Sequence, residues 1–110
     1  MILFGKEIKP GSRVLIIAEA GINHDGDADT AMRMIDVAAK AGADVVKFQK
    51  RDMATLYRSD CLKEAHVSSH SLGVYIPILK QCELSEKSHE RLFKHCHDVG
   101  IGYLCSPWDI

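Results

Sequence analysis

The sequence predicts an α/β fold with parallel strands, preceded by a short β-hairpin. Three apolar segments have the composition of buried strands, at residues 14–18, 43–49 and 101–105. The stretches between them carry apolar side chains at the three- and four-residue spacing that is typical of helices. Strand and helix alternate at the size of a βαβ unit, about 30 residues for the first pair, which favours a parallel sheet.

The first elements follow from local signals. Residues 1–13 are predicted to form the hairpin, since two short β-prone stretches flank Gly5 and Lys6. The run at 14–18 is apolar without alternation, as in a parallel strand buried on both faces. Asp27 is the predicted N-cap of the next helix. The other signals of this helix are an apolar stripe and a C-terminal glycine: Ala28, Met32, Ile35, Ala39 and Gly42.

The second half of the chain is less regular. Residues 50–71 are polar and aperiodic, and they are predicted to form a long loop of the kind that often carries function. A short helix is predicted for 72–84, with Pro77 near its start or at a kink. Ser85 is the predicted N-cap of a further helix, and Gly100 ends it. The apolar side of that helix is predicted to consist of Leu92, Phe93, Cys96 and Val99.

Composition excludes several classes of protein. The net charge is −1 and the basic residues are scattered, which argues against a nucleic-acid surface. No apolar run approaches the roughly 20 residues that span a bilayer, and the N-terminus lacks the pattern of a signal peptide. We therefore expect a cytoplasmic protein, in whose reducing environment the four cysteines are free thiols; none of them forms a C-x-x-C pair.

Polar side chains gather at the carboxyl end of each predicted strand. In parallel α/β folds, ligands bind at this edge, where the side chains of several strands converge. The candidate site residues are Glu19, Asn23, His24, Lys47, Gln49, Ser106 and Trp108. A carboxylate, an ammonium, an amide and a hydroxyl brought together there would suit a polar, anionic substrate.

Two features of the sequence, Lys47 and the pair His66 and His70, have competing interpretations. Lys47 lies within an apolar run, where an unpaired ammonium is costly, so it either faces a polar cavity or pairs with a carboxylate such as Glu19. His66 and His70 are four residues apart and could share a helical face as metal ligands. No third ligand stands at a matching interval, and we interpret both histidines as solvated surface residues.

Three motifs resemble those of the N-acetylneuraminate (sialic acid) synthase family, in the same order. Residues 17–26 (IAEAGINHDG) resemble the family signature I-A-E-x-G-x-N-H-x-G. Residues 41–49 (AGADVVKFQ) resemble its A-G-A-D-x-V-K-F-Q segment, and 105–109 (CSPWD) its S-[TS]-P-[FW] element. The resemblance implies that the chain is the N-terminal portion of a (β/α)8 TIM barrel, with the hairpin in 1–13 and the first three strands and intervening helices in 14–110.

The resemblance also implies a reaction. Members of this family condense phosphoenolpyruvate with an N-acetylated sugar such as N-acetylmannosamine, which yields a 2-keto sugar acid and phosphate. By position, Lys47 matches the lysine that binds phosphoenolpyruvate, and Glu19 matches the carboxylate that contacts the sugar. Gln49 matches a sugar-side contact, and Ser106 stands where a threonine is usual near the phosphate. The resemblance thus implies Glu19, Lys47 and Gln49 as catalytic residues. It assigns Ser106 to substrate binding, together with Asn23 and His24 at the rim and Trp108, where phenylalanine is common.

Several family properties are not expected in this chain. The family uses a divalent metal, commonly manganese, but its metal-binding histidines lie on later strands, so we predict no metal ligand here. The family is a homodimer in which a C-terminal domain of one subunit completes the site of the other. We therefore expect these 110 residues to be an inactive fragment that holds part of the substrate cradle.

Two alternatives remain open. The first is a synthase of a related nonulosonic acid or of a spore-coat polysaccharide precursor, which residues 49–52 and 106–109 favour. The second is a non-catalytic α/β module that completes a split barrel, with its exposed strand edge as the interface. The sequence does not fix the sugar acceptor, the metal or the oligomeric state.

Overall fold

The computed structural model describes residues 1–57 and 72–108, with side chains from residue 75 onward in the second range. Helices and strands alternate along most of the described chain. In order, they are β1 (Ile2–Leu3), β2 (Lys6–Glu7), β3 (Ile17–Gly21), α1 (Ala28–Lys40), β4 (Val45–Lys50), α2 (Met53–Leu56), α4 (Leu72–Cys82), α5 (Glu86–Val99) and β5 (Gly102–Pro107). The predicted α/β class is confirmed.

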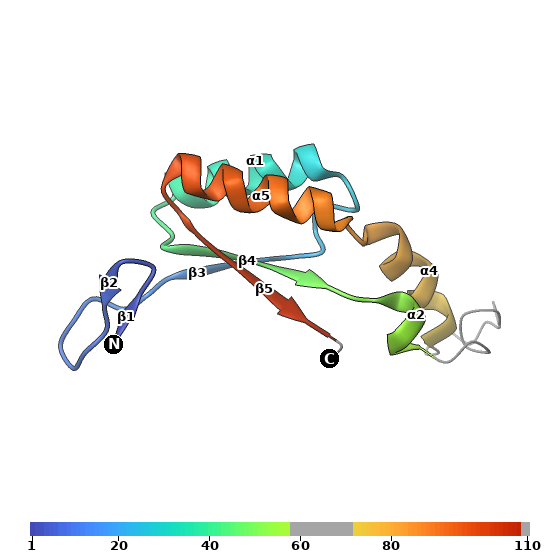
Figure 1. Cartoon of the computed structure of the whole chain (residues 1–110), viewed down its shortest axis with the longest axis horizontal. Coiled ribbons are helices and arrows are strands. Elements are labelled where there is room, and N and C mark those ends of the chain that lie inside the picture. The colour runs from blue at the N-terminus through green and yellow to red at the C-terminus, as the bar shows by residue number, and fades with distance from the viewer. Residues whose placement is uncertain (58–71, 109–110) are drawn as a thin grey trace.

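The three main strands form a parallel sheet in the order β3-β4-β5. Helices α1 and α5 lie side by side on one face of this sheet, and the β1–β2 hairpin lies near the amino ends of the strands (Figure 1). Helices α2 and α4 follow the carboxyl end of β4 (Figure 1). We call the side of β3, β4 and β5 that faces away from α1 and α5 the open face.

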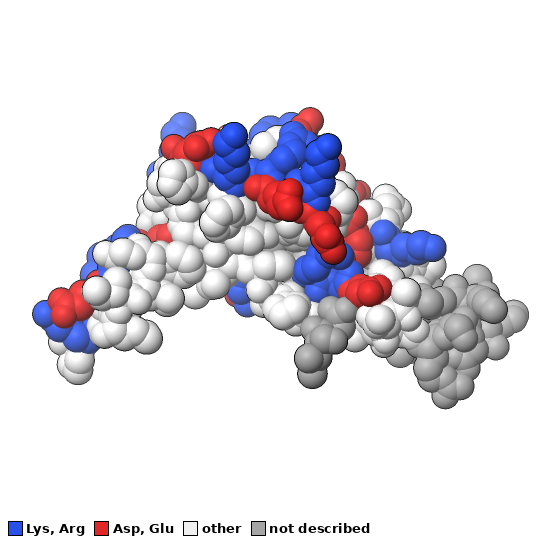
Figure 2. All heavy atoms as spheres, viewed as in Figure 1, with Lys and Arg blue, Asp and Glu red and all other residues white. Residues whose placement is uncertain are grey.

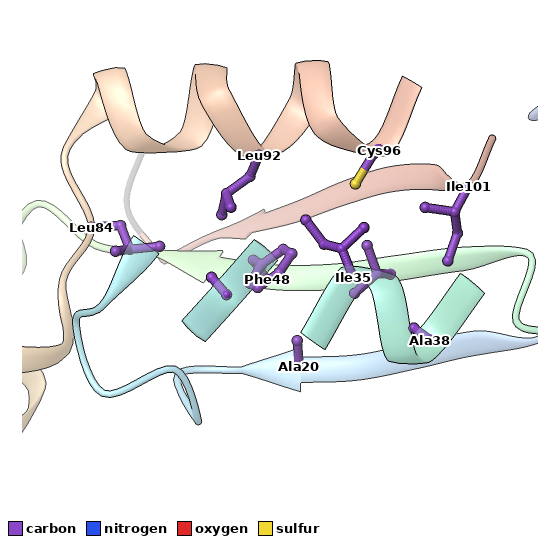
Figure 3. Packing of buried hydrophobic residues seen from close by; sticks show 10 residues of the cluster. Ala20, Ile35, Ala38, Phe48, Leu84, Leu92, Cys96 and Ile101 are labelled. Atoms are coloured by element: carbon purple, nitrogen blue, oxygen red, sulfur yellow. The ribbon is translucent and has the colours of Figure 1, made fainter. Parts of the chain in front are cut away.

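The hydrophobic core lies between the sheet and these two helices. Phe48 of β4 is fully buried beneath Ile35 of α1 and Leu92 of α5 (Figure 3). Ala20 and Val46 belong to the same cluster. Because successive strand residues point to opposite faces, the residues next to them in sequence point to the open face.

Helix ends follow the sequence signals. Asp27 caps α1 by accepting hydrogen bonds from the amides of the next turn, and the Ser85 hydroxyl accepts from the Ser88 amide at the start of α5. Gly42 and Gly100 both adopt the left-handed conformation, with φ of 86° and 78°. Each cap satisfies backbone groups that a helix terminus leaves unpaired, so these boundaries were predictable from single residues.

The predicted N-terminal hairpin is present, but its turn lies one residue earlier than predicted, because Lys6 already belongs to β2. Its strands are antiparallel, and its two-residue turn consists of Phe4 and Gly5, both with positive φ. The Phe4 ring lies against β5, since a Cβ built at Gly102 would stand 2.7 Å from the Phe4 ring. Glycine at position 102 therefore lets the hairpin approach the sheet closely.

The first core strand differs from its prediction. Strand β3 begins at Ile17 rather than at residue 14, and Val14 and Ile17 are 74% and 40% exposed instead of buried on both faces. Within the described residues β3 pairs with β4 alone, and helices cover one of its faces. The preceding backbone is held by Asp44 instead: the amide of Ile16 donates to the Asp44 carboxylate over 2.8 Å.

Further predictions need smaller corrections. The segment predicted as a loop from residue 50 contains the four-residue helix α2, while 58–71 lie outside the described residues. Pro77 lies inside α4 rather than near its start. Phe93, predicted on the buried side of α5, is 61% exposed, because α5 packs through Leu92 and Cys96, and Phe93 lies edge-on to Tyr103. Val99 is 39% exposed for the same reason.

Candidate functional site

Glu19 and Lys47 lie side by side on the open face of the sheet. They are direct partners in the β3–β4 ladder, and the Lys47 Nζ is 2.7 Å from the Glu19 Oε1. The pairing interpretation of Lys47 holds, since its ammonium has a carboxylate partner, and the side chain also faces away from the helices. The Lys47 side chain is 29% exposed, so a ligand on the open face can reach the ammonium.

Gln49 and Ser106 extend this cluster toward the carboxyl ends of the strands. They are direct partners in the β4–β5 ladder, and both are half-buried. Gln49 follows Lys47 by two residues, so it lies on the same face, roughly 7 Å farther along the strand. The structure thus brings together Glu19, Lys47, Gln49 and Ser106, the four residues expected to form the substrate cradle.

Arg51 is a residue of this region that the sequence analysis missed. Its Nη2 donates to the Gln49 Oε1 over 2.8 Å, and its guanidinium carbon lies 4.5 Å from the centre of the Trp108 ring. Glu83, between α4 and α5, accepts from the Arg51 amide over 2.9 Å and also pairs with Lys50. The two basic residues after Gln49 indicated a charged region in the sequence. Nothing near them indicated that Glu83, far along the chain, is their partner.

Asn23 and His24, predicted at the rim, lie in the turn after β3. Asn23 is exposed, and its side-chain amide donates to the Ala20 carbonyl over 3.0 Å. His24 is 1% exposed, with its ring 5.9 Å from that of Phe48 on the helix side of the sheet. Its Nδ1 accepts from the Gly26 amide, so the ring is held inside the turn and does not join the rim. Burial lowers the pKa of His24, which favours the neutral ring.

The chemistry of the open face is that of binding. One ammonium, one carboxylate, one amide and one hydroxyl can hold an anionic group and several hydroxyl groups. In the part of the chain that the structure describes, no three His, Cys, Asp or Glu side chains form a group that could hold a metal ion. The carboxylate of Glu19 is paired with Lys47, so the described residues of the open face do not fit the divalent metal that the resemblance implies.

The rest of the surface has a different character. Figure 2 shows charged side chains gathered over α1 and α5, above a largely uncharged surface on the sheet side. Among residues 1–57 and 72–108, no helix has both the length and the apolar character that crossing a membrane requires. Cys82, Cys96 and Cys105 are free thiols, whereas Cys61, His66, His70 and Asp109 lie outside the described residues.

Known proteins resemble this chain in sequence and in structure. A model described as the NeuB family matches residues 34–110. The spore coat polysaccharide biosynthesis protein SpsE of Bacillus subtilis is 53% identical over 104 residues, which cover 94% of this chain and 28% of that protein. The N-acetylneuraminate-9-phosphate synthase of Homo sapiens is 38% identical over 95 residues, which cover 86% of this chain and 26% of that protein.

A solved structure shares the arrangement of strands and helices. It is the N-acetylneuraminic acid (sialic acid) synthetase of Leptospira borgpetersenii, with a TM-score of 0.74 and 29% sequence identity, over 96% of this chain and 35% of that one. The chain therefore spans about a third or less of the length of the relatives it matches. Because the family model covers more than half of the residues and the fold agrees, the chain belongs to the NeuB family.

Proposed function

We propose that this chain forms part of a synthase that condenses phosphoenolpyruvate with an N-acetylated sugar to give a sialic-acid-type sugar acid and phosphate. In this proposal β3, β4 and β5 are the first three strands of an eight-stranded β/α barrel. The open face then becomes the barrel interior, and α1 and α5 belong to the outer ring of helices. The active sites of such barrels lie at the carboxyl ends of the strands, which is where this chain has its polar residues.

The observation that carries the proposal is the Glu19–Lys47 pair beside Gln49 and Ser106. Lys47 supplies a positive charge that suits the carboxylate or phosphate of phosphoenolpyruvate. Glu19 and Gln49 supply groups that bind sugar hydroxyls and the acetamido group, and Ser106 stands near the phosphate. We place Asn23 and Trp108 on the exposed substrate side, while the buried His24 supports the turn between β3 and α1 from behind.

Groups outside this chain complete the proposed site. The described residues provide no set of ligands for the divalent metal that the family resemblance implies. Binding and orientation of the two substrates are the contribution of this chain. A partner subunit is likewise part of the proposal for the whole enzyme.

A related sugar acid is the second candidate. The 53% identity to the B. subtilis spore coat polysaccharide protein exceeds the 38% identity to the human synthase. This difference favours a synthase for a spore-coat or other nonulosonic acid precursor. The two candidates share the phosphoenolpyruvate half of the site and differ in the sugar acceptor.

A titration of the chain with phosphoenolpyruvate, followed by ¹H–¹⁵N NMR, tests the shared half. We expect shifts at Lys47, Gln49 and Ser106. Lys47→Met should weaken binding by about tenfold or more, because it removes a charge-assisted contact. Lys40→Met, at the exposed end of α1, is the matched control and should bind as the unaltered chain does. Equal binding by the Lys47 and Lys40 variants would contradict the proposal.

A further inference from the structure

Arg51 is a buried cation in contact with a residue of the open face. It is 6% exposed, although it follows directly on β4 near the surface-exposed Asp52. Three groups surround its guanidinium: the Gln49 amide, the Glu83 carboxylate and the Trp108 ring. We call Gln49, Arg51, Glu83 and Trp108 the arginine clamp.

Glu83 and Trp108 fix the position of the guanidinium. The Glu83 Oε1 is 3.9 Å from the Arg51 Nη1, and the other oxygen accepts from the Arg51 backbone amide. Trp108 covers the guanidinium plane, and its own amide donates to the Lys50 carbonyl over 3.0 Å, which anchors it to β4. The guanidinium is therefore contacted from β4, from the residue that follows β5 and from the α4–α5 connection, while its Nη1 has no hydrogen-bond partner within the described residues.

The chemistry of arginine then determines which way the Gln49 amide points. A guanidinium has five N–H donors and no acceptor, so the Gln49 atom in contact with it must be the carbonyl oxygen. The amide nitrogen is turned the other way, toward β3, where a Cβ built at Gly21 would be 3.8 Å from the Gln49 Nε2. Among residues 1–57 and 72–108, the bond accepted from Arg51 is the one side-chain hydrogen bond that Gln49 makes.

We propose that Arg51 is a positioning residue that holds Gln49 as a hydrogen-bond donor, so that this position of the site recognises an oxygen acceptor of the substrate, either an amide carbonyl or a carboxylate. The assignment of that substrate rests on the proposed function. The orientation of Gln49 does not, because it follows from the donor-only chemistry of Arg51. A free glutamine amide could turn over and accept from a hydroxyl group, and Arg51 removes that option.

The first test measures orientation without any ligand. In the full chain, we expect a nuclear Overhauser effect between the Gln49 side-chain NH₂ and the Gly21 α-protons. Arg51→Met keeps most of the side-chain volume but removes the donors, and it should abolish this signal. Arg51→Lys retains a hydrogen-bond donor and should keep part of the Gln49–Gly21 signal. A residue that only stabilises the fold would lower the thermal midpoint in both variants without this difference between them.

The second test measures recognition. Gln49→Glu keeps the contact with Arg51 but replaces the outward NH₂ by an oxygen, so binding of the acceptor group should fall by about tenfold or more. N-acetylmannosamine is compared with mannose, and phosphoenolpyruvate is titrated separately. If the amide carbonyl of the sugar is the group recognised, the variant loses its preference for N-acetylmannosamine. If the carboxylate is the group recognised, the variant instead binds phosphoenolpyruvate more weakly. Trp108, the single tryptophan, provides a fluorescence signal for each titration.

The outcomes separate the two proposals. A persistent Gln49–Gly21 signal in Arg51→Met, or unchanged binding of both ligands by Gln49→Glu, overturns the positioning role. Loss of the signal together with equal binding by the Lys47 and Lys40 variants overturns the proposed function instead, and the orientation of Gln49 by Arg51 stands. Loss of the Gln49–Gly21 signal in Arg51→Met, together with weaker binding by Lys47→Met and Gln49→Glu, supports both proposals.

Discussion

At the scale of single residues, His24 shows how burial turns an apparent site residue into a structural one. Its ring is inside the turn after β3, and burial lowers its pKa below 6.5. The folded chain then keeps the ring neutral at a pH where the unfolded chain takes up a proton. Stability is therefore present above the unfolded pKa and is lost as the pH falls through the folded one.

We accordingly predict a flatter pH dependence for His24→Gln. Between about pH 7.5 and about pH 5, the free energy of unfolding of the unaltered chain should decline as the pH falls. The variant should lose part of that slope and keep the rest, since burial also lowers the pKa of His89. Urea unfolding at several pH values measures the slope. The exposed His97→Gln is the control, and the same slope in both variants would refute the prediction.

The pairing of Glu19 with Lys47 was predictable from sequence because a local rule applied. Lys47 in an apolar run needed a carboxylate partner, and Glu19, one βα unit away, stands opposite it in the ladder. No local rule linked Arg51 to Glu83, 32 residues away, or to Trp108 just after the neighbouring strand. These contacts depend on where α4 and β5 lie, which the residues around Arg51 do not determine.

At the scale of elements, the helix caps are the features that sequence predicts best. The Ser85 hydroxyl accepts from the Ser88 amide over 3.1 Å and starts α5. We expect Ser85→Ala to destabilise the chain by about 1 kcal/mol, because the Ser88 amide in the first turn of α5 loses its acceptor. Urea unfolding compares it with the exposed Lys87→Ala, which keeps the cap. Equal stability of the two variants would show that the cap is not needed.

Strand β3 shows why strand boundaries were harder to predict. Residues 14–18 have the composition of a buried strand, yet the ladder begins at Ile17. Asp44 holds the preceding backbone and the hairpin region by accepting from Ile16, Lys6 and Arg13. The sequence motif of residues 41–49, which contains Asp44, gave no indication of these three partners.

Asp44 therefore connects the N-terminal region to the sheet in a pH-dependent way. The Ile16 amide, followed by Lys6, holds the pKa of its carboxyl below 3.8. A depressed pKa contributes stability above the unfolded value that is lost as the pH falls through the folded one. We predict that Asp44→Asn is less stable than the unaltered chain at neutral pH, and that the gap narrows toward pH 3. Urea unfolding midpoints at several pH values measure this difference in stability, and the exposed Asp98→Asn is the control. A difference that does not narrow toward pH 3 would contradict the stabilising role of the Asp44 charge.

At the scale of the whole molecule, the chain is extended rather than compact. The Cα radius of gyration is 16.5 Å, whereas a compact domain of this length has about 13 Å. Helices cover one face of the sheet, and several large apolar side chains remain exposed around it: Val14, Ile16, Ile17, Val37 and Phe93. Exposed apolar side chains beside unpaired strand edges favour association with another polypeptide.

We predict that the chain self-associates through the region before β3 as its concentration rises. Val14 and Ile16 are 74% and 47% exposed next to the strand edge that β4 does not pair. Replacing both by lysine should shift sedimentation-velocity profiles toward the monomer, because charged side chains at an edge oppose strand addition. Glu90→Lys on the exposed surface of α5 changes the net charge by the same amount and is the control. Only the double variant should reduce association, since an effect of net charge alone would appear in both.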